Sequence, residues 1–451
     1  MQLFQKAAKP FVVFVEKYYP NPFVFVIVVT AITFLLAIGL TNTTPMEAVD
    51  AWGGGLSKLL AFMAQLSLTL IAAHALAHTD MAQKGLSKLA QLPTNHFQAY
   101  FLVTFIAGIA NLIAWSLGLV VGALMARQVA IEADKKNIAI HYPLLVASAY
   151  AGFVLWHMGY SSSSALFAAT PGHSLEAQVG IIPVTETILS TFNIAIALIT
   201  LLAICLICPL MHPRKEEIIS LTAATLKTAP ETLQNDNNAI NTLGKKLDNS
   251  RVFTFLLGLL LVIFLTKWFA DKGLDLNLNI VNWSFLAIGL LLARNVQHYM
   301  DLVKNASRAV GEILIQYPFY AGIMGLMASS GLVELLSNWF TTHATADTLS
   351  FYAFLSGGIV NLFIPSGGGQ WVIQGPVFLE AAQQLKVDPS VIVLAVSYGD
   401  QWTNMVQPFW TIPLLAVAGL DMRKIMGYTF VILLVTFLTF GGGLLILGSG
   451  Y

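Results

Sequence analysis

Long apolar runs separated by short polar segments dominate the chain. A helix needs roughly 20 apolar residues to cross the hydrocarbon core of a bilayer. Nine runs reach or approach that length, and the sixth is the shortest: Pro22–Leu40, Ser57–Thr79, Pro143–Ala168, Ile188–Leu210, Val252–Phe269, Val281–Ala293, Ala309–Ser330, Pro389–Leu420 and Ile425–Leu447. The pattern therefore predicts an all-α polytopic membrane protein with about nine full spans.

Two further apolar stretches are interrupted in the middle. Phe97–Ile131 is broken at Ala114–Gly118, and Phe351–Ala382 is broken at Pro365–Gly369. Small and polar residues at the centre of an apolar stretch are typical of a hairpin. Each hairpin leaves on the side it entered, whether it is re-entrant or crosses twice.

Composition supports a membrane protein. The 451 residues are 57% hydrophobic and 10% charged, with a mean hydropathy of +0.73, which is more apolar surface than one soluble core buries. Lys and Arg balance Asp and Glu at 23 each, so no electrostatic argument favours a nucleic acid partner. The two cysteines, Cys205 and Cys208, lie inside an apolar run and are expected to pack there.

The positions of the basic residues orient the chain. In the nine-span map, all but four of the 23 Lys and Arg residues fall on one set of alternating connections; the exceptions are Lys58, Lys267, Lys272 and Lys386. Basic residues mark cytoplasmic connections, so we expect a cytoplasmic N-terminus and a periplasmic C-terminus. The polar segment 212–250 is then a cytoplasmic linker between a first half, 1–211, and a second half, 251–451.

The two halves resemble each other. The pattern Gly-Ile-Ala-Asn-Leu, then Ser and Gly, at 108–118 has a counterpart at 358–368, and Met81–Leu89 resembles Met327–Leu335. Five predicted spans precede the second copy, and an odd number inverts it. Inverted repeats with Gly- or Pro-interrupted segments at equivalent places indicate a secondary transporter.

Polar residues gather at the hairpin tips and in the two spans that follow, 143–168 and 389–420. Such residues are costly at bilayer depth unless they line a cavity. Gly-rich turns also present free N–H groups to a carboxylate, and neither tip holds Lys or Arg. The candidate substrate-binding residues are Asn111, Ser116, Gly118, Ser161, Ser162, Ser163, Ser164, Asn361, Pro365, Ser366, Gly367, Gly368, Gly369, Gln370, Thr403 and Asn404. A side chain at Gly368 is expected to block close approach of the backbone.

Two ionisable residues inside spans are candidates for coupling transport to a cation. Asp400 could carry a proton or lie beside Na⁺, or it could be paired structurally with Asn or Tyr. His157 could relay a proton, or its ring could hydrogen-bond a freed carbonyl. We therefore expect H⁺ or Na⁺ as the coupling ion, with no other cofactor and no metal site.

Four segments carry a family resemblance: 361–376 (NLFIPSGGGQWVIQGP), Tyr19–Phe23, Ala169–His173 and Tyr398–Trp402. Together they resemble the bacterial short-chain fatty acid transporter family over nearly the whole chain. That family belongs with the ion-transporter superfamily of inverted-repeat, two-hairpin carriers. The resemblance implies uptake of monocarboxylates such as acetoacetate or butyrate across the inner membrane. Composition and spacing alone indicate only an anion carrier.

The leading hypothesis is a cation-coupled symporter that works by an elevator-like shift of a hairpin-bearing unit against a scaffold, with the scaffold spans as a homodimer surface. A C4-dicarboxylate carrier is the alternative within the superfamily, although it calls for more positive charge at the tips. An intramembrane hydrolase with Ser366 as nucleophile and a histidine base leaves the mirrored serine unexplained. An anion channel does not explain two opposed hairpins.

Overall fold

A computed structural model describes residues 22–173, 175–221, 243–273, 278–307 and 310–447, and every regular element within these ranges is a helix. The basic N-terminal segment and residues 222–242 of the linker lie outside the described residues. The helices of the first half are α2 (Pro22–Leu40), α3 (Pro45–Gly55), α4 (Leu60–Ala77), α5 (Asp80–Ala90), α6 (His96–Ile113), α7 (Trp115–Lys135), α8 (Tyr142–Ala151), the 3₁₀ helix η1 (Gly152–Met158), α9 (Ser163–Ala168), α10 (Glu176–Val179) and α11 (Thr191–Leu210).

The rest of the chain begins with a short 3₁₀ turn, η2 (Lys215–Glu217), and repeats this order of elements from α15 onward. Its helices are α13 (Leu243–Asp248), α14 (Arg251–Lys272), α15 (Leu278–Leu292), α16 (Val296–Ser307), α17 (Gly311–Ser329), α18 (Leu332–Thr342), α19 (Leu349–Asn361), α20 (Gly367–Leu385), α21 (Pro389–Thr403), the 3₁₀ turn η3 (Asn404–Val406), α22 (Pro408–Ala418) and α23 (Arg423–Leu447). In this order α15 to α23 correspond to α2 to α11.

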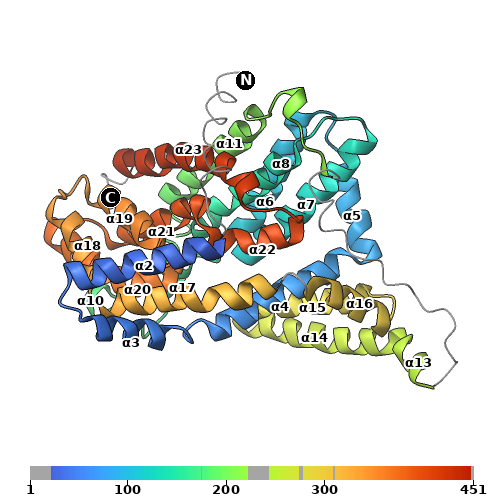
Figure 1. The fold of residues 1–451 in the computed structure, drawn as a ribbon, viewed down its shortest axis with the longest axis horizontal. Helices are drawn as coiled ribbons and strands as arrows, with labels where there is room; N and C mark the ends of the chain where they lie inside the picture. The colour runs from blue at the N-terminus through green and yellow to red at the C-terminus, as the bar shows by residue number, and fades with distance from the viewer. Residues whose placement is uncertain (1–21, 174, 222–242, 274–277, 308–309, 448–451) are drawn as a thin grey trace.

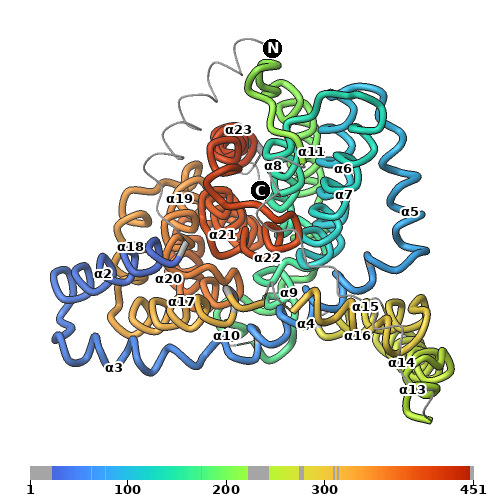
Figure 2. Tube along the Cα trace, turned by 45° about the vertical axis from the view of Figure 1, so that its right-hand side comes forward, coloured from blue at the N-terminus to red at the C-terminus, as the bar shows by residue number. Residues whose placement is uncertain are grey.

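The molecule divides into a lower row of helices and an upper bundle (Figure 1). The lower row, which we call the scaffold, has α2, α3 and α17 at one end and α4, α14, α15 and α16 at the other. The two repeats exchange helices within it, because α4 packs against α15 and α16 while α17 packs against α2 and α3. The upper bundle holds the first hairpin, α19, α21 and α22, while α20 lies at the level of α17 in both views (Figure 1 and Figure 2).

Several predicted spans appear as long apolar helices. Six helices of the described part are long and apolar enough to cross a membrane, and a seventh span is possible if α17 and α18, which bend by 60° at their junction, count as one. Those six include α6 and α7, the two arms of the first hairpin. The protein is a multi-pass α-helical membrane protein, as the hydropathy predicts.

Both predicted hairpins and both broken spans are confirmed. The first hairpin turns at Ala114, whose extended backbone separates two tightly packed helices, and the second turns between α19 and α20. The first broken span is α8, η1 and α9, and the second is α21, η3 and α22. Pro408 begins α22, where its missing N–H leaves no helical hydrogen bond unmade.

Four short helices that lie between longer ones were not predicted from the sequence. α3, α5, α16 and α18 have 11 or 12 residues each, too few to cross a bilayer. A local signal for α3 was present, because Thr44 and Glu47 form a capping box and Pro45 is the first helical residue.

The match of Met81–Leu89 with Met327–Leu335 is wrong as a structural equivalence. Gly85 lies inside α5, whereas Gly331 has φ 78° and separates α17 from α18. The equivalent helices α5 and α18 begin at Asp80 and Leu332, six residues away from the expected register.

Candidate functional site

The two broken helices meet at a buried pair of ionisable side chains. His157 lies in η1 and Asp400 lies in α21, and these two elements pack against each other. His157 Nε2 is 3.3 Å from Asp400 Oδ1, with the two side chains 0% and 1% exposed. Burying ionisable groups this deeply is costly unless they are paired, and Asp400 Oδ1 also lies 3.5 Å from Asn404 Nδ2, one turn later in the chain.

The imidazole of His157 is fixed on its other sides as well. Its Nδ1 is hydrogen-bonded to Ser162 Oγ at 3.2 Å, and its backbone N–H donates to Gln401 Oε1 at 2.9 Å. The ring of Trp156 lies against it, with centroids 3.5 Å apart. The hydroxyl of Ser162, the imidazole of His157 and the carboxylate of Asp400 therefore lie in a row, with a hydrogen bond between the first two and a 3.3 Å contact between the last two.

The tip of the second hairpin closes on this pair at Gly367, the first residue of α20. Ser164 Oγ donates to the carbonyl of Gly367 at 3.2 Å. A Cβ at Gly367 would overlap His157 Nε2 and Cε1 and would lie 2.8 Å from Ser163 Oγ. At Gly368 the nearest atom to a Cβ would be Ser163 Cβ at 3.5 Å, an ordinary contact. The close backbone approach expected at Gly368 is therefore at Gly367 instead.

Asn361, the last residue of α19, ties the second hairpin to the second broken helix. Its Nδ2 lies within hydrogen-bonding distance of three oxygens: Asp400 O at 2.8 Å, Thr403 Oγ1 at 3.0 Å and Asn404 Oδ1 at 2.7 Å. In return, Gln407 Nε2 donates to Asn361 O at 2.8 Å. Two of these bonds pair backbone carbonyls in the last turns of helices, Asp400 O in α21 and Asn361 O in α19.

Several buried polar atoms around the pair have no hydrogen-bond partner among the residues that the structure describes. They are Trp156 Nε1, His157 Nε2, Ser163 Oγ, Asn361 Oδ1, Asp400 Oδ2, Gln401 Nε2 and Gln407 Oε1; the 3.3 Å contact of His157 Nε2 with Asp400 Oδ1 lacks hydrogen-bond geometry. Buried polar groups are nearly always paired, so a cluster of unpaired ones marks a place where a ligand or ion completes the bonding. Both donors and acceptors are present, as a carboxylate and a cation would require.

The first hairpin does not mirror this arrangement. Asn111 donates to Ala107 O of its own helix at 2.7 Å, and its side chain fills the space that a Cβ at Gly118 would occupy. Ser161 Oγ accepts the backbone N–H of Trp115 at 2.9 Å, and Ser116 is buried beside that turn. Asn111, Gly118 and Ser161 thus pack within the first hairpin and its neighbouring turn, and Asn111 Oδ1, like Asn361 Oδ1, is a buried acceptor without a partner in the described residues. No hydrogen bond joins these residues or Ser116 to the His157–Asp400 pair in the described structure.

The remaining candidates belong to the second hairpin. Pro365 is buried, and Ser366 is the residue before α20, with its Oγ 3.1 Å from where a Cβ at Gly369 would lie. Gln370 Nε2 donates to Gly357 O and to Gln374 Oε1, both at 2.9 Å, and Gln374 donates to Ser356. Gln370 therefore links α20 to α19 through its hydrogen bond to Gly357 O.

Sequence reasoning left Gln374, Gln401 and Gln407 out of the site. A signal existed for each, because Gln374 is one helical turn after Gln370 and the other two lie in the polar segment 398–408. Ionisable side chains stand out in an apolar span more clearly than neutral amides do.

Comparison with known proteins identifies the family. A family model described as "Short chain fatty acid transporter" matches residues 3–447. The chain belongs to this family. Two relatives named as candidate short-chain fatty acid transporters cover nearly its whole length: one from Escherichia coli K12, 39% identical over 96% of this chain and 97% of the relative, and one from Haemophilus influenzae, 38% identical over 94% and 95%.

Two solved transporters are also similar to this family member. The YdaH transporter of Alcanivorax borkumensis aligns over 94% of this chain and 98% of its own, with a TM-score of 0.45 and 16% identity. MtrF of Neisseria gonorrhoeae, from a class of antimetabolite efflux pumps, aligns over 95% and 96%, with a TM-score of 0.42 and 15% identity.

Proposed function

We propose that this transporter carries short-chain monocarboxylates such as acetoacetate or butyrate across the bacterial inner membrane together with a proton. The observation that carries the proposal is the buried His157–Asp400 pair, which the tip of the second hairpin contacts at Gly367. The names of the family model and of the two bacterial relatives support the substrate class.

The chemistry of the pair favours a proton over Na⁺. An imidazole and a carboxylate in contact can hold one proton between them. A proton taken up by the pair offsets the charge of an incoming carboxylate, so the buried site gains no net charge. This avoids the large penalty of burying an uncompensated ion.

The ligand-facing atoms favour one carboxylate over two. The unpaired donors are the neutral groups Trp156 Nε1, Ser163 Oγ and Gln401 Nε2, and the described site contains no Lys or Arg contact. A second carboxylate of a dicarboxylate would be buried without a partner there. The monocarboxylate is therefore preferred.

Transport on this proposal is an elevator-like movement. The upper bundle moves against the scaffold and presents the His157–Asp400 site to one side of the membrane and then to the other. The N-terminus is cytoplasmic and the C-terminus periplasmic, and the scaffold forms a homodimer surface.

The test is uptake of labelled butyrate by proteoliposomes that contain the purified protein, with a proton gradient or a sodium gradient imposed alone. Accumulation driven by the proton gradient, abolished by a protonophore and not competed by succinate, is the expected result. Accumulation with sodium alone would overturn the proton assignment. Succinate accumulation without butyrate accumulation would overturn the monocarboxylate assignment.

A second candidate is a hydrolase, because Ser162, His157 and Asp400 are the three groups of a serine catalytic triad. The histidine bonds Ser162 and not Ser366, the nucleophile considered from the sequence. We favour a carrier, since the relatives are named as transporters and all three groups are buried. Hydrolysis of 4-nitrophenyl butyrate by the purified protein, lost in Ser162→Ala, would reverse this choice.

A further inference from the structure

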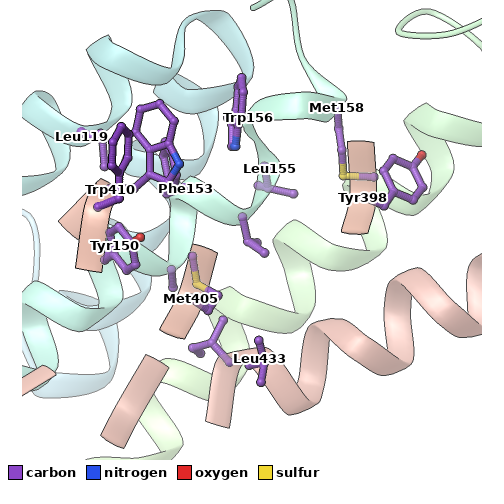
Figure 3. Close-up of a cluster of buried hydrophobic side chains, with 14 of the residues drawn as sticks. Leu119, Tyr150, Phe153, Leu155, Trp156, Met158, Tyr398, Met405, Trp410 and Leu433 are labelled. Carbon is purple, nitrogen blue, oxygen red and sulfur yellow. The ribbon is translucent and has the colours of Figure 1, made fainter. Parts of the chain in front are cut away.

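Three aromatic rings stand together beside the candidate site, and we call Phe153, Trp156 and Trp410 the aromatic wall. Ring centroids are 5.9 Å apart for Phe153 and Trp156, 5.5 Å for Phe153 and Trp410, and 6.0 Å for Trp156 and Trp410. All three are within a few per cent of complete burial. Figure 3 shows the three side chains among other buried residues; Phe153 and Trp156 come from η1 and Trp410 from α22.

The 3₁₀ geometry of η1 produces this arrangement. A 3₁₀ helix has three residues per turn, so side chains at i and i+3 eclipse each other. Phe153 and Trp156 occupy such positions, and their rings are nearly parallel, at an interplanar angle of 14°. In a regular α-helix the two rings would be offset around the axis.

The wall is continuous with the ligand-facing atoms. Trp156 directly precedes His157, their ring centroids are 3.5 Å apart, and Trp156 Nε1 is one of the buried donors without a partner in the described residues. A carboxylate that accepts from this donor and from Ser163 Oγ would lie beside His157. Because Trp156 supplies this donor and is itself part of the wall, we expect the carbon chain of the substrate to meet the wall.

Other buried rings pack against the aromatic wall and hold its side chains in place. The ring of Tyr150 stacks behind Phe153 at 5.7 Å, and Phe409 packs edge-on against Trp410 at 4.9 Å. Both of these rings are completely buried, and Tyr150 also donates to Asn404 O at 2.7 Å. Protein interiors are close-packed, so a chain that pressed on the wall would have to displace this whole layer.

We propose that the aromatic wall sets the upper limit on the length of the aliphatic chain that the transporter accepts. The inference rests on the proposed function and identifies Phe153, Trp156 and Trp410 as the residues that determine specificity within it. Acids up to the limiting length gain affinity with each methylene that leaves water, and longer acids are excluded by overlap with the rings.

The experiment is competition of unlabelled acids of two to eight carbons against labelled butyrate uptake, in the wild type and in Phe153→Leu. In the wild type, affinity is expected to rise about fourfold per methylene, corresponding to about 0.8 kcal/mol, and then to fall sharply above a limiting length. Phe153→Leu shortens the wall and is expected to move that limit to longer acids.

Phe440→Leu is the matched control, because Phe440 is as deeply buried but lies in α23 against Tyr398. It should leave the length limit unchanged. Trp410→Phe provides a second test if Phe153→Leu does not fold. An unaltered limit in the folded wall variants, or an equal shift in Phe440→Leu, overturns the proposal. Failure of the wild type to take up any of these acids would instead overturn the proposed function.

Discussion

Replacing Gly367 by alanine tests whether the hairpin tip closes on the His157–Asp400 pair. The added methyl group would overlap the imidazole and lie 2.8 Å from Ser163 Oγ, inside the 3.4 Å at which ordinary van der Waals contact begins. The imidazole cannot turn away, because Ser162, Asp400 and Trp156 hold it. Relief therefore requires the tip to withdraw from the pair.

The magnitude follows from the usual cost of overpacking a close-packed site, about 1–3 kcal/mol. Applied to the closed arrangement alone, this lowers its population, and with it the butyrate uptake rate, by about 5- to 150-fold. The protein should still fold, because withdrawal of the tip leaves the rest of the bundle intact. The assay is the initial rate of butyrate uptake at equal amounts of reconstituted protein.

Gly368→Ala is the control, since a methyl group there meets only Ser163 at 3.5 Å. Both glycines are in the first turn of α20, so replacing either one by alanine raises the helix propensity by the same amount. This effect therefore cancels when the two variants are compared with each other. Gly368→Ala should transport within about twofold of the wild type. Equal rates for the two variants would refute the reasoning.

Three other outcomes are expected. Asp400→Asn keeps the shape of the side chain but leaves no carboxylate to bind a cation, so proton-driven accumulation of butyrate should disappear while butyrate exchange persists; retained accumulation would exclude Asp400 as the coupling group. Asn361→Ala removes the amide group that lies within hydrogen-bonding distance of three buried oxygens and should lower the free energy of unfolding by about 3 kcal/mol, seen as a reduced Tm in detergent; an unchanged Tm would contradict the role given to this amide. Burial lowers the pKa of His141, in the connection before α8, to about 4, and its neutral Nδ1 accepts the N–H of Ile219 at 3.0 Å. The unfolded chain binds this proton more readily, so stability should decline as the pH falls from about 6.5 to 4, and His141→Gln should flatten the Tm profile in that window; identical profiles would argue against it.

The breaks in the fold could be predicted because their cause is local. Gly and Pro residues at 365–369 and 408 interrupt an apolar pattern, and such interruptions end helices whatever surrounds them. Asp400 and His157 stood out for a similar reason, since ionisable side chains are rare in spans. Their contact was not predictable, because the residues are far apart in the chain and only the packing of η1 on α21 brings them together.

The four serines at 161–164 show where local reasoning ends. In the sequence they are equivalent, but each has a different neighbour: Ser161 the N–H of Trp115, Ser162 the imidazole, Ser163 no partner among the described residues, and Ser164 the carbonyl of Gly367. The irregular backbone between η1 and α9 points successive side chains in different directions, and no periodic rule describes such a segment.

The two hairpins also differ in the hydrogen-bond partners of matching residues, and this difference could not be predicted from the sequence. Asn111 and Asn361 match in sequence, yet Asn111 turns back into its own hairpin and Asn361 reaches across to α21. The difference follows from packing, because α6 lies tightly against α7 while α19 lies mainly against α21. A repeated motif indicates a repeated backbone, but not a repeated set of partners.

The exchange of helices within the scaffold has a consequence for biogenesis. α4 is made early, but its partners α15 and α16 follow roughly 200 residues later, which corresponds to about 10–40 s of synthesis at 5–20 residues per second. During that interval α4 lies in the membrane without α15 and α16, so the surface of α4 that later packs against them is not yet covered. Insertion and folding are then separate events, and neither half is a folding unit by itself.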